Sequence, residues 1–131
     1  MAVMKPAKVK LVIYQGATYW KEWIWKDANE DPINLTNYTA RMQIREEVDS
    51  EEVLLEILSS GTSEKKLYIG GKVEDDPTNG KYGIWMDASV TAAITFESGV
   101  YDIELEDSAG YVRRIMEGKV QVSPEVTRPT S

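Results

Sequence analysis

Two stretches of this sequence decide its fold: Tyr38-Thr39-Ala40-Arg41-Met42-Gln43-Ile44-Arg45 and, far downstream, Val100-Tyr101-Asp102-Ile103-Glu104-Leu105. In both, apolar side chains occupy every second position, and polar or charged side chains occupy most of the positions between. Alternation with a period of two is typical of an antiparallel strand that buries one face and exposes the other. We therefore predict a β-rich domain organised around these two strands.

Similar short segments recur along the chain, separated by turn formers such as the run 75–80, which ends in Asn79-Gly80. We expect strands at 8–14, 18–26, 38–45, 53–58, 67–69, 82–86, 100–105 and 111–122. Residues 87–94 form the one plausible helix, with Asp87 or Ser89 as its cap. Many short strands with close turns predict an all-β antiparallel sandwich, immunoglobulin-like or jelly-roll-like, and a small closed barrel is the alternative.

The domain organisation follows from the same pattern. The chain of 131 residues is long enough for one hydrophobic core. We expect a single sandwich over residues 8–123, a short N-terminal arm over 1–7 and an extended C-terminal arm over 124–131. The N-terminal residues contain no long apolar run, so we expect neither a signal peptide nor a membrane span, and no membrane partner.

Composition excludes several functions. The sequence contains no cysteine and no histidine, so it has no disulfides, no thiolate metal sites and no serine-histidine or cysteine-histidine catalysis. Its net charge of -7 opposes binding to phosphate backbones, and nucleic acid is therefore not an expected partner. We predict a protein without a cofactor, a metal ion or an enzymatic activity.

Tryptophans concentrate in the second expected strand. Alternation places Tyr19, Trp23 and Trp25 on one face and Trp20 on the other. We interpret Trp23 and Trp25 as core residues, and we predict that Trp20 and Trp85 contact a partner, because tryptophan rarely lies exposed without a reason. The alternative is that these indoles form a stacking platform for sugars, as in a carbohydrate-binding module.

Acidic residues form three groups, at 46–52, 74–76 and 102–107. None shows the spacing of a calcium loop, and no paired carboxylates across a cleft identify a glycosidase, so we interpret all three as solvated. Carboxylates on strands are expected to pair across the sheet with basic residues, namely Arg41, Arg45, Arg113 or Arg114. Gly118, inside the last strand, is expected to form a bulge.

The C-terminal segment has no core pattern. Val126, Thr127 and Arg128 are extended, and we predict that they contact a partner, either along its surface or by adding to the edge of its sheet. The N-terminal arm is a second candidate for this role.

The sequence resembles a family of small β-sandwich structural proteins of tailed bacteriophages and prophages, akin to the N-terminal domains of fibre and upper-baseplate proteins. Three motifs carry the resemblance: a Leu35-Thr36 turn before an arginine-containing strand, the Tyr101-Asp102 strand, and the Glu-Val-Thr-Arg end at 125–128. The Leu-Thr turn is usually followed by glycine, and Asn37 stands there in this chain. Asparagine also tolerates a left-handed backbone, so we expect the turn to be preserved.

This resemblance implies a virion protein that is assembled in the host cytoplasm and binds other virion proteins, in several symmetric copies or as a homo-oligomer. Because no fibre follows Arg128, we expect an accessory or adaptor protein at the tail tip, baseplate or fibre-attachment region. A position in the neck or collar, decoration of the capsid, and glycan binding for host attachment are the alternatives. The resemblance implies no catalytic residues.

Overall fold

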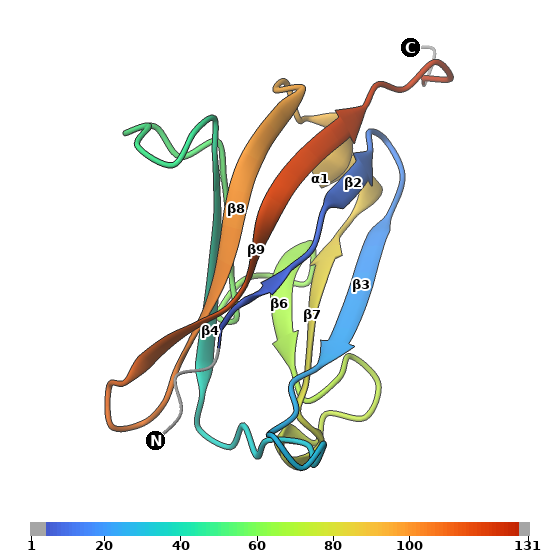
Figure 1. Ribbon diagram of the computed structural model, residues 1–131. Coiled ribbons are helices and arrows are strands. Elements are labelled where there is room, and N and C mark those ends of the chain that lie inside the picture. Colours follow the sequence, from blue (N-terminus) through green and yellow to red (C-terminus); the bar gives the residue numbers. More distant parts are fainter. Residues whose placement is uncertain (1–4, 129–131) are drawn as a thin grey trace.

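The computed structural model describes residues 5–128, which form two β-sheets packed face to face (Figure 1). The elements, in chain order, are β1 (Ala7–Lys8), β2 (Leu11–Tyr14), β3 (Tyr19–Ile24), β4 (Thr39–Arg45), β5 (Leu55–Leu58), β6 (Lys65–Ile69), a 3-10 turn (Pro77–Asn79), β7 (Lys81–Met86), α1 (Ala88–Ala92), β8 (Ser98–Glu106) and β9 (Val112–Ser123). The predicted sandwich is confirmed.

Strand order identifies the kind of sandwich. The larger sheet has the order β1-β9-β8-β4-β5, with β2 also paired with β9, and the smaller sheet has the order β3-β7-β6. When the strands from β2 onward are named A to G, these sheets contain A-G-F-C-C′ and B-E-D, which is the Greek-key order of an immunoglobulin-like domain. The jelly-roll and closed-barrel alternatives do not have this order.

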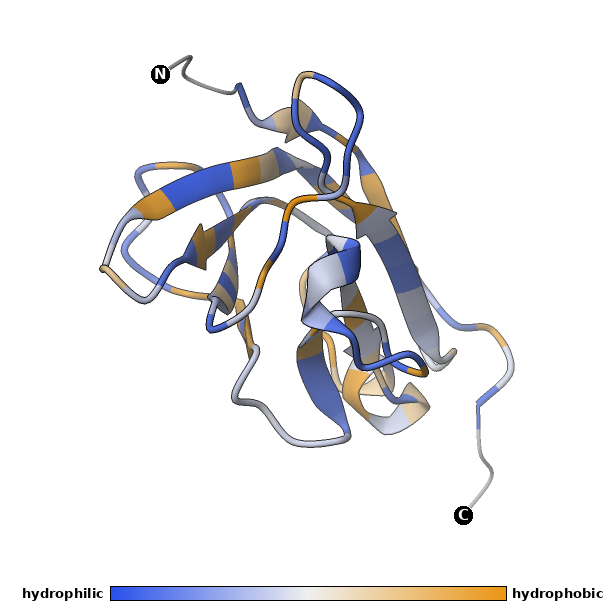
Figure 2. Cartoon of the chain, turned by 90° about the horizontal axis from the view of Figure 1, so that it is seen from below, coloured by the Kyte–Doolittle hydropathy of each residue, from blue (hydrophilic) through white to orange (hydrophobic). Residues whose placement is uncertain are grey.

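The core lies between the two sheets. Inward residues of the larger sheet include Met42, Ile44 and Ile103, and those of the smaller sheet include Ile84 and Met86, all almost fully buried. Along the strands, hydrophobic and hydrophilic residues follow each other, as Figure 2 shows in a view from below. Each strand therefore has one face in the core and one outer face.

The first strand differs from its prediction. Residues 8–14 were expected to form one strand, but β1 and β2 are separate, and both pair with β9 in the parallel direction. The break falls at Val9, whose carbonyl oxygen accepts a hydrogen bond of 2.6 Å from the Tyr101 hydroxyl. The same carbonyl lies against Gly118, where a Cβ atom would collide with it. Gly118 thus makes room for the neighbouring backbone.

The expectation of a bulge at Gly118 is wrong. Gly118 pairs with Tyr101 in regular register, and the irregularity lies between Ile103 and Glu104, which pair with Met116 and Arg114. The extra residue is Ile115. Ile115 and Met116 are consecutive and both buried, which regular alternation does not allow and a bulge does.

The turns and the helix follow their sequence signals. Asn37 has a φ of 65°, in the left-handed region expected for the turn after Leu35-Thr36. Helix α1 lies within the predicted range 87–94, with Asp87 at its N-cap position. The Asp87 side chain makes no capping hydrogen bond, because its carboxylate binds Trp85 instead.

Candidate interaction surface

Three aromatic rings share the outer face of the smaller sheet. Trp20 of β3 pairs with Trp85 of β7, and Tyr68 of β6 pairs with Gly83 of β7. The Trp20 ring centroid lies 6.1 Å from that of Trp85 and 5.9 Å from that of Tyr68, the latter in an edge-to-face arrangement. All three rings are half-buried, although no other element of the described chain forms a layer over them.

Gly83 makes this arrangement possible. A Cβ atom at position 83 would lie 2.7 Å from the Trp20 ring and 2.8 Å from the Lys21 carbonyl oxygen. The Trp20 ring therefore lies directly over the backbone of β7, in space that any larger residue would fill. Glycine at this position leaves room for the Trp20 indole beside Tyr68 and Trp85.

A carboxylate fixes the second indole. Trp85 Nε1 donates a hydrogen bond of 2.7 Å to Asp87 Oδ1, in the connection between β7 and α1. A charged acceptor makes such a bond short and directional. Trp85 therefore presents its ring in one orientation, which reduces the entropy that a contact on it would lose.

Two lysines border the rings. Lys66 Nζ lies 5.0 Å from the Tyr68 ring centroid, and Lys72 Nζ lies 4.5 Å from the Trp85 centroid and 5.8 Å from that of Tyr68. These are cation–π contacts. Within residues 5–128 neither lysine has an ion pair with a carboxylate. We name Trp20, Tyr68, Trp85, Lys66 and Lys72 the aromatic face.

A third lysine beside this face is already paired. Lys81 Nζ lies 2.9 Å from Glu74 and 3.7 Å from Glu22. The hydrogen bond to Glu74 raises the pKa of Lys81 and lowers the pKa of Glu74. The charge of Lys81 is therefore neutralised within the molecule, whereas those of Lys66 and Lys72 remain available.

The other tryptophans belong to the core side, as predicted. Trp25 is buried and makes an edge-to-face contact with Tyr38, and Trp23 stacks on Tyr82 at 5.8 Å. Near them the Tyr19 hydroxyl is buried and has no hydrogen-bond partner among residues 5–128. Burial raises the pKa of Tyr19 to about 12 and the pKa of Tyr82 to about 12.

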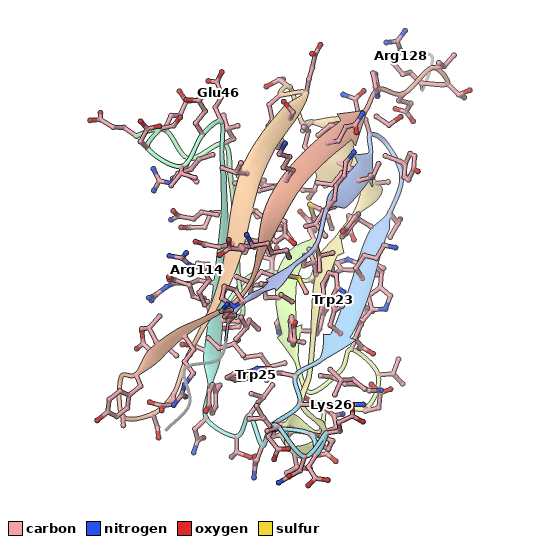
Figure 3. The ribbon with its side chains drawn as sticks, viewed as in Figure 1. Trp23, Trp25, Lys26, Glu46, Arg114 and Arg128 are labelled. Atoms are coloured by element: carbon pink, nitrogen blue, oxygen red, sulfur yellow. The ribbon has the colours of Figure 1, made fainter. Side chains whose placement is uncertain are left out.

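The outer face of the larger sheet is different in character. Arg41 of β4 forms ion pairs with Glu104 at 2.8 Å and Glu106 at 3.2 Å, both on β8. Arg114 of β9 pairs with Asp102 at 3.5 Å and Glu117 at 3.4 Å, and it is labelled in Figure 3. The predicted pairing of strand carboxylates is confirmed for these two arginines. Arg45 instead donates to the carbonyl oxygens of Ser50 and Glu51.

The C-terminal arm begins beside the turn between β2 and β3. Its first part is held by the domain, because the Glu125 backbone N–H donates to Gln15 Oε1 at 3.0 Å. Val126 is 92% exposed, and Thr127 and Arg128 are also exposed at this end of the molecule (Figure 3). Of the residues predicted to contact a partner, the structure thus brings Trp20 and Trp85 into ring contact.

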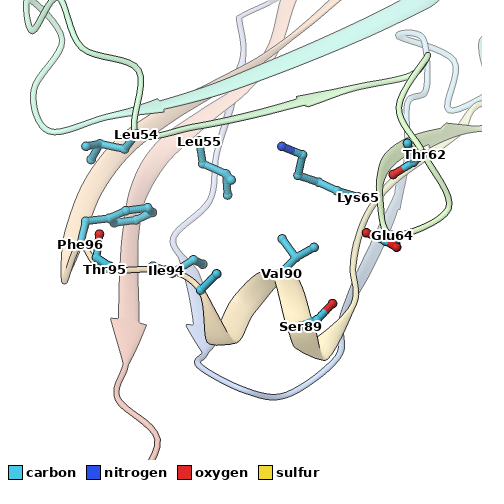
Figure 4. A pocket seen from close by; sticks show the side chains of 11 residues that line it. Leu54, Leu55, Thr62, Glu64, Lys65, Ser89, Val90, Ile94, Thr95 and Phe96 are labelled. Carbon is cyan, nitrogen blue, oxygen red and sulfur yellow. The ribbon is translucent and has the colours of Figure 1, made fainter.

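An apolar groove opens beside α1. Leu54 and Leu55, next to the edge strand β5, face Val90, Ile94 and Phe96 across a cavity of about 440 Å³ (Figure 4). Glu64 and Lys65 border it on the β6 side. Nothing in the described chain covers this groove, and the sequence pattern gave no reason to expect it.

Residues 5–128 contain no group of three or more acidic side chains placed to hold a metal ion. Within the same residues, no helix has the length and apolar character that a bilayer span requires.

The aromatic face includes residues that sequence reasoning missed. Tyr68 and Lys66 were not selected, although they alternate with the buried Leu67 and therefore had to point outward. Lys72 follows the strand and had no signal of its own.

No known protein family matches this sequence, and no curated protein matches it. Function must therefore be inferred from this geometry and from the sequence motifs.

Proposed function

We propose that this chain is a non-enzymatic structural protein of a tailed-phage particle, where it acts through protein–protein contacts at the tail tip, baseplate or fibre-attachment region. The motifs at Leu35-Thr36, Tyr101-Asp102 and 125–128 support the phage assignment by resemblance. The aromatic face supports the mode of action. Its partners are other virion proteins, and copies of the chain are arranged by the symmetry of the particle.

One observation carries the proposal: Trp20, Tyr68 and Trp85 pack together on an outer sheet face beside two lysines that form no ion pair within the described part of the chain. Aromatic residues are enriched at the centres of protein interfaces, where they contribute a large part of the binding energy. A charged rim sets the orientation of the partner. The Trp20 ring lies over Gly83 and the Trp85 ring is held by Asp87. Both rings suit this role, because they have little conformational freedom to lose when a partner binds.

Glycan binding at the same face is the second candidate, because tryptophans can stack on sugar rings. Stacking requires a free ring face, and here Lys72 lies over Trp85 and Lys66 over Tyr68. The Trp20 and Trp85 rings are also tilted by 55° rather than coplanar. This geometry favours a protein partner. Positions in the neck or on the capsid would use the same face and remain alternative locations.

Mass spectrometry of purified particles from the host that carries the gene tests the proposal. We expect this chain to be present at a defined ratio to the other structural proteins. Particles that contain none of it would overturn the virion assignment.

A variant of the aromatic face tests whether this face binds the partner. Replacing Trp20 and Trp85 together by alanine should yield particles from which the chain is missing, while the purified variant still melts cooperatively. Replacing the exposed Tyr14 and Tyr111 by alanine is the matched control, since these aromatics lie off the face and are 62% and 67% exposed. A blue shift of tryptophan fluorescence with host polysaccharide would instead support the glycan alternative.

A further inference from the structure

The aromatic face carries two lysines on an acidic molecule, and the Asp87 carboxylate at its border is engaged by Trp85 Nε1. The chain has a net charge of -7, yet Lys66 and Lys72 have no ion pair in the described residues. A face that combines exposed aromatic area with unpaired positive charge fits a segment that combines an apolar side chain with carboxylates. The partner segment must therefore be acidic and must carry an apolar residue.

The same chain presents such a segment. Residues 46–52, in the connection from β4 to β5, contain Glu46, Glu47, Asp49, Glu51 and Glu52. Val48 stands among them with 87% of its surface exposed. No carboxylate of this segment has an ion pair within residues 5–128. The segment is held by its backbone, because Arg45 Nη1 donates to the Ser50 carbonyl oxygen at 2.7 Å.

The aromatic face and the 46–52 segment cannot meet within one molecule. The segment projects from the end of β4, where Figure 3 labels Glu46, and it belongs to the larger sheet. The aromatic face lies on the outer side of the smaller sheet, formed by β3, β7 and β6. The core of the sandwich lies between the larger sheet and that face. Only a second molecule can bring complementary surfaces together.

We propose that the aromatic face binds the 46–52 segment of a second copy of this chain. Val48 packs on Trp20 and Trp85, and the carboxylates approach Lys66 and Lys72. This inference rests on the proposed role of the aromatic face as a protein interface. The contact joins two different surfaces, so it is heterologous, and repetition gives a ring or a stack rather than a two-fold dimer.

The net charge does not prevent this contact. Two acidic copies repel at long range, but at physiological ionic strength the Debye length is about 8 Å. Charges farther apart than this are largely screened, whereas the lysines and carboxylates at the contact are not. Charge therefore decides which surfaces meet, and the rings and Val48 provide the apolar area.

Sedimentation of the purified chain over a concentration series at physiological salt is the first measurement. We expect reversible association, and we expect Lys66→Glu with Lys72→Glu to weaken it at least tenfold. Lys5→Glu with Lys26→Glu is the matched control, because it makes the same change of charge at exposed lysines that belong neither to the face nor to the hollows beside Glu46 and Val48. The control pair should associate as the unmodified chain does.

Charge reversal supplies the decisive arm. Glu47→Lys with Glu51→Lys should weaken association at least tenfold on its own, as the double lysine variant does. A mixture of the two variants should associate, because each basic surface then meets an acidic one. Failure of the mixture, or undiminished association of either variant alone, would refute the inference.

Two further outcomes separate this inference from the proposed function. If the chain is monomeric at every concentration, the inference is wrong. If particles nevertheless contain the chain and lose it when Trp20 and Trp85 are replaced, the proposed function stands and the face binds a different protein. Binding of an acidic polysaccharide by the monomer at this face would overturn both.

Discussion

The two outer faces of this sandwich differ in whether their basic side chains are paired with carboxylates. On the larger sheet, Arg41 and Arg114 each pair with two carboxylates, so both arginine charges are neutralised within the face. On the smaller sheet, Trp20, Tyr68 and Trp85 lie beside Lys66 and Lys72, which form no ion pair with a carboxylate within residues 5–128. The larger sheet thus has an outer face whose two arginines are paired, and the smaller sheet has an outer face suited to binding a partner.

The largest expected effect comes from high pH, which acts on the core that holds the two faces apart. Burial raises the pKa of Tyr19 and of Tyr82 from 10 to about 12. Below pH 10 both states are neutral and stability is constant. Between pH 10 and about 12 the unfolded state loses protons that the folded state retains, so stability falls. Two pKa units correspond to at most about 3 kcal/mol for each tyrosine.

Urea unfolding at several pH values between 8 and 12 measures this loss. A free energy of unfolding that stays constant up to pH 12 would contradict the prediction.

Gly83→Ala should damage the aromatic face while the charged face remains intact. The new methyl group would lie 2.7 Å from the Trp20 ring and 2.8 Å from the Lys21 carbonyl oxygen. Overpacking of this kind costs about 1–3 kcal/mol. Thermal unfolding measures the cost, and the same change made together with Trp20→Ala should cost less, because one of the two clashes is then removed. Equal costs in both backgrounds would show that Trp20 does not lie over Gly83.

Tyr19→Phe should stabilise the protein, whereas Gly83→Ala should destabilise it. The Tyr19 hydroxyl is buried without a partner, and an unsatisfied buried polar group costs about 1–3 kcal/mol. Phenylalanine keeps the ring and removes that cost, so we expect a gain of about 1 kcal/mol and a smaller loss of stability at high pH. Tyr101→Phe is the contrasting variant, because it removes the bond to Val9 and should destabilise.

Arg41→Ala should have the smallest effect. Its guanidinium is half-exposed, and exposed ion pairs contribute about 1 kcal/mol or less. We expect a loss within that limit that shrinks in high salt, and no change in any association through the aromatic face. A large loss would mean that the charged face is not simply solvated.

Much of the fold was predictable because alternation is a local property. The parity of Trp20 against Trp23 and Trp25 placed it on an outer face before any pairing was known. The left-handed turn at Asn37 was also local.

The rest depended on contacts distant in sequence. That Tyr68 lies opposite Gly83, and so completes the aromatic face, follows from the register of β6 on β7. The break at Val9 depends on Tyr101, and the bulge at Ile115 depends on β8. The adjacent apolar pair Ile115-Met116 indicates a bulge, because regular alternation would expose one of the two residues. The sequence-based prediction placed the bulge at Gly118 instead.

The parallel pairing of β2 with β9 has a consequence for biosynthesis. Leu11 lies beside Val120, so β2 finds its place in the sheet only after β9 has been synthesised. Until then the backbone edge of the nascent domain is open, and its completion is governed by a contact of high sequence separation, which is slow to form. The synthesis of β9, rather than that of β2, therefore sets the moment at which this domain closes.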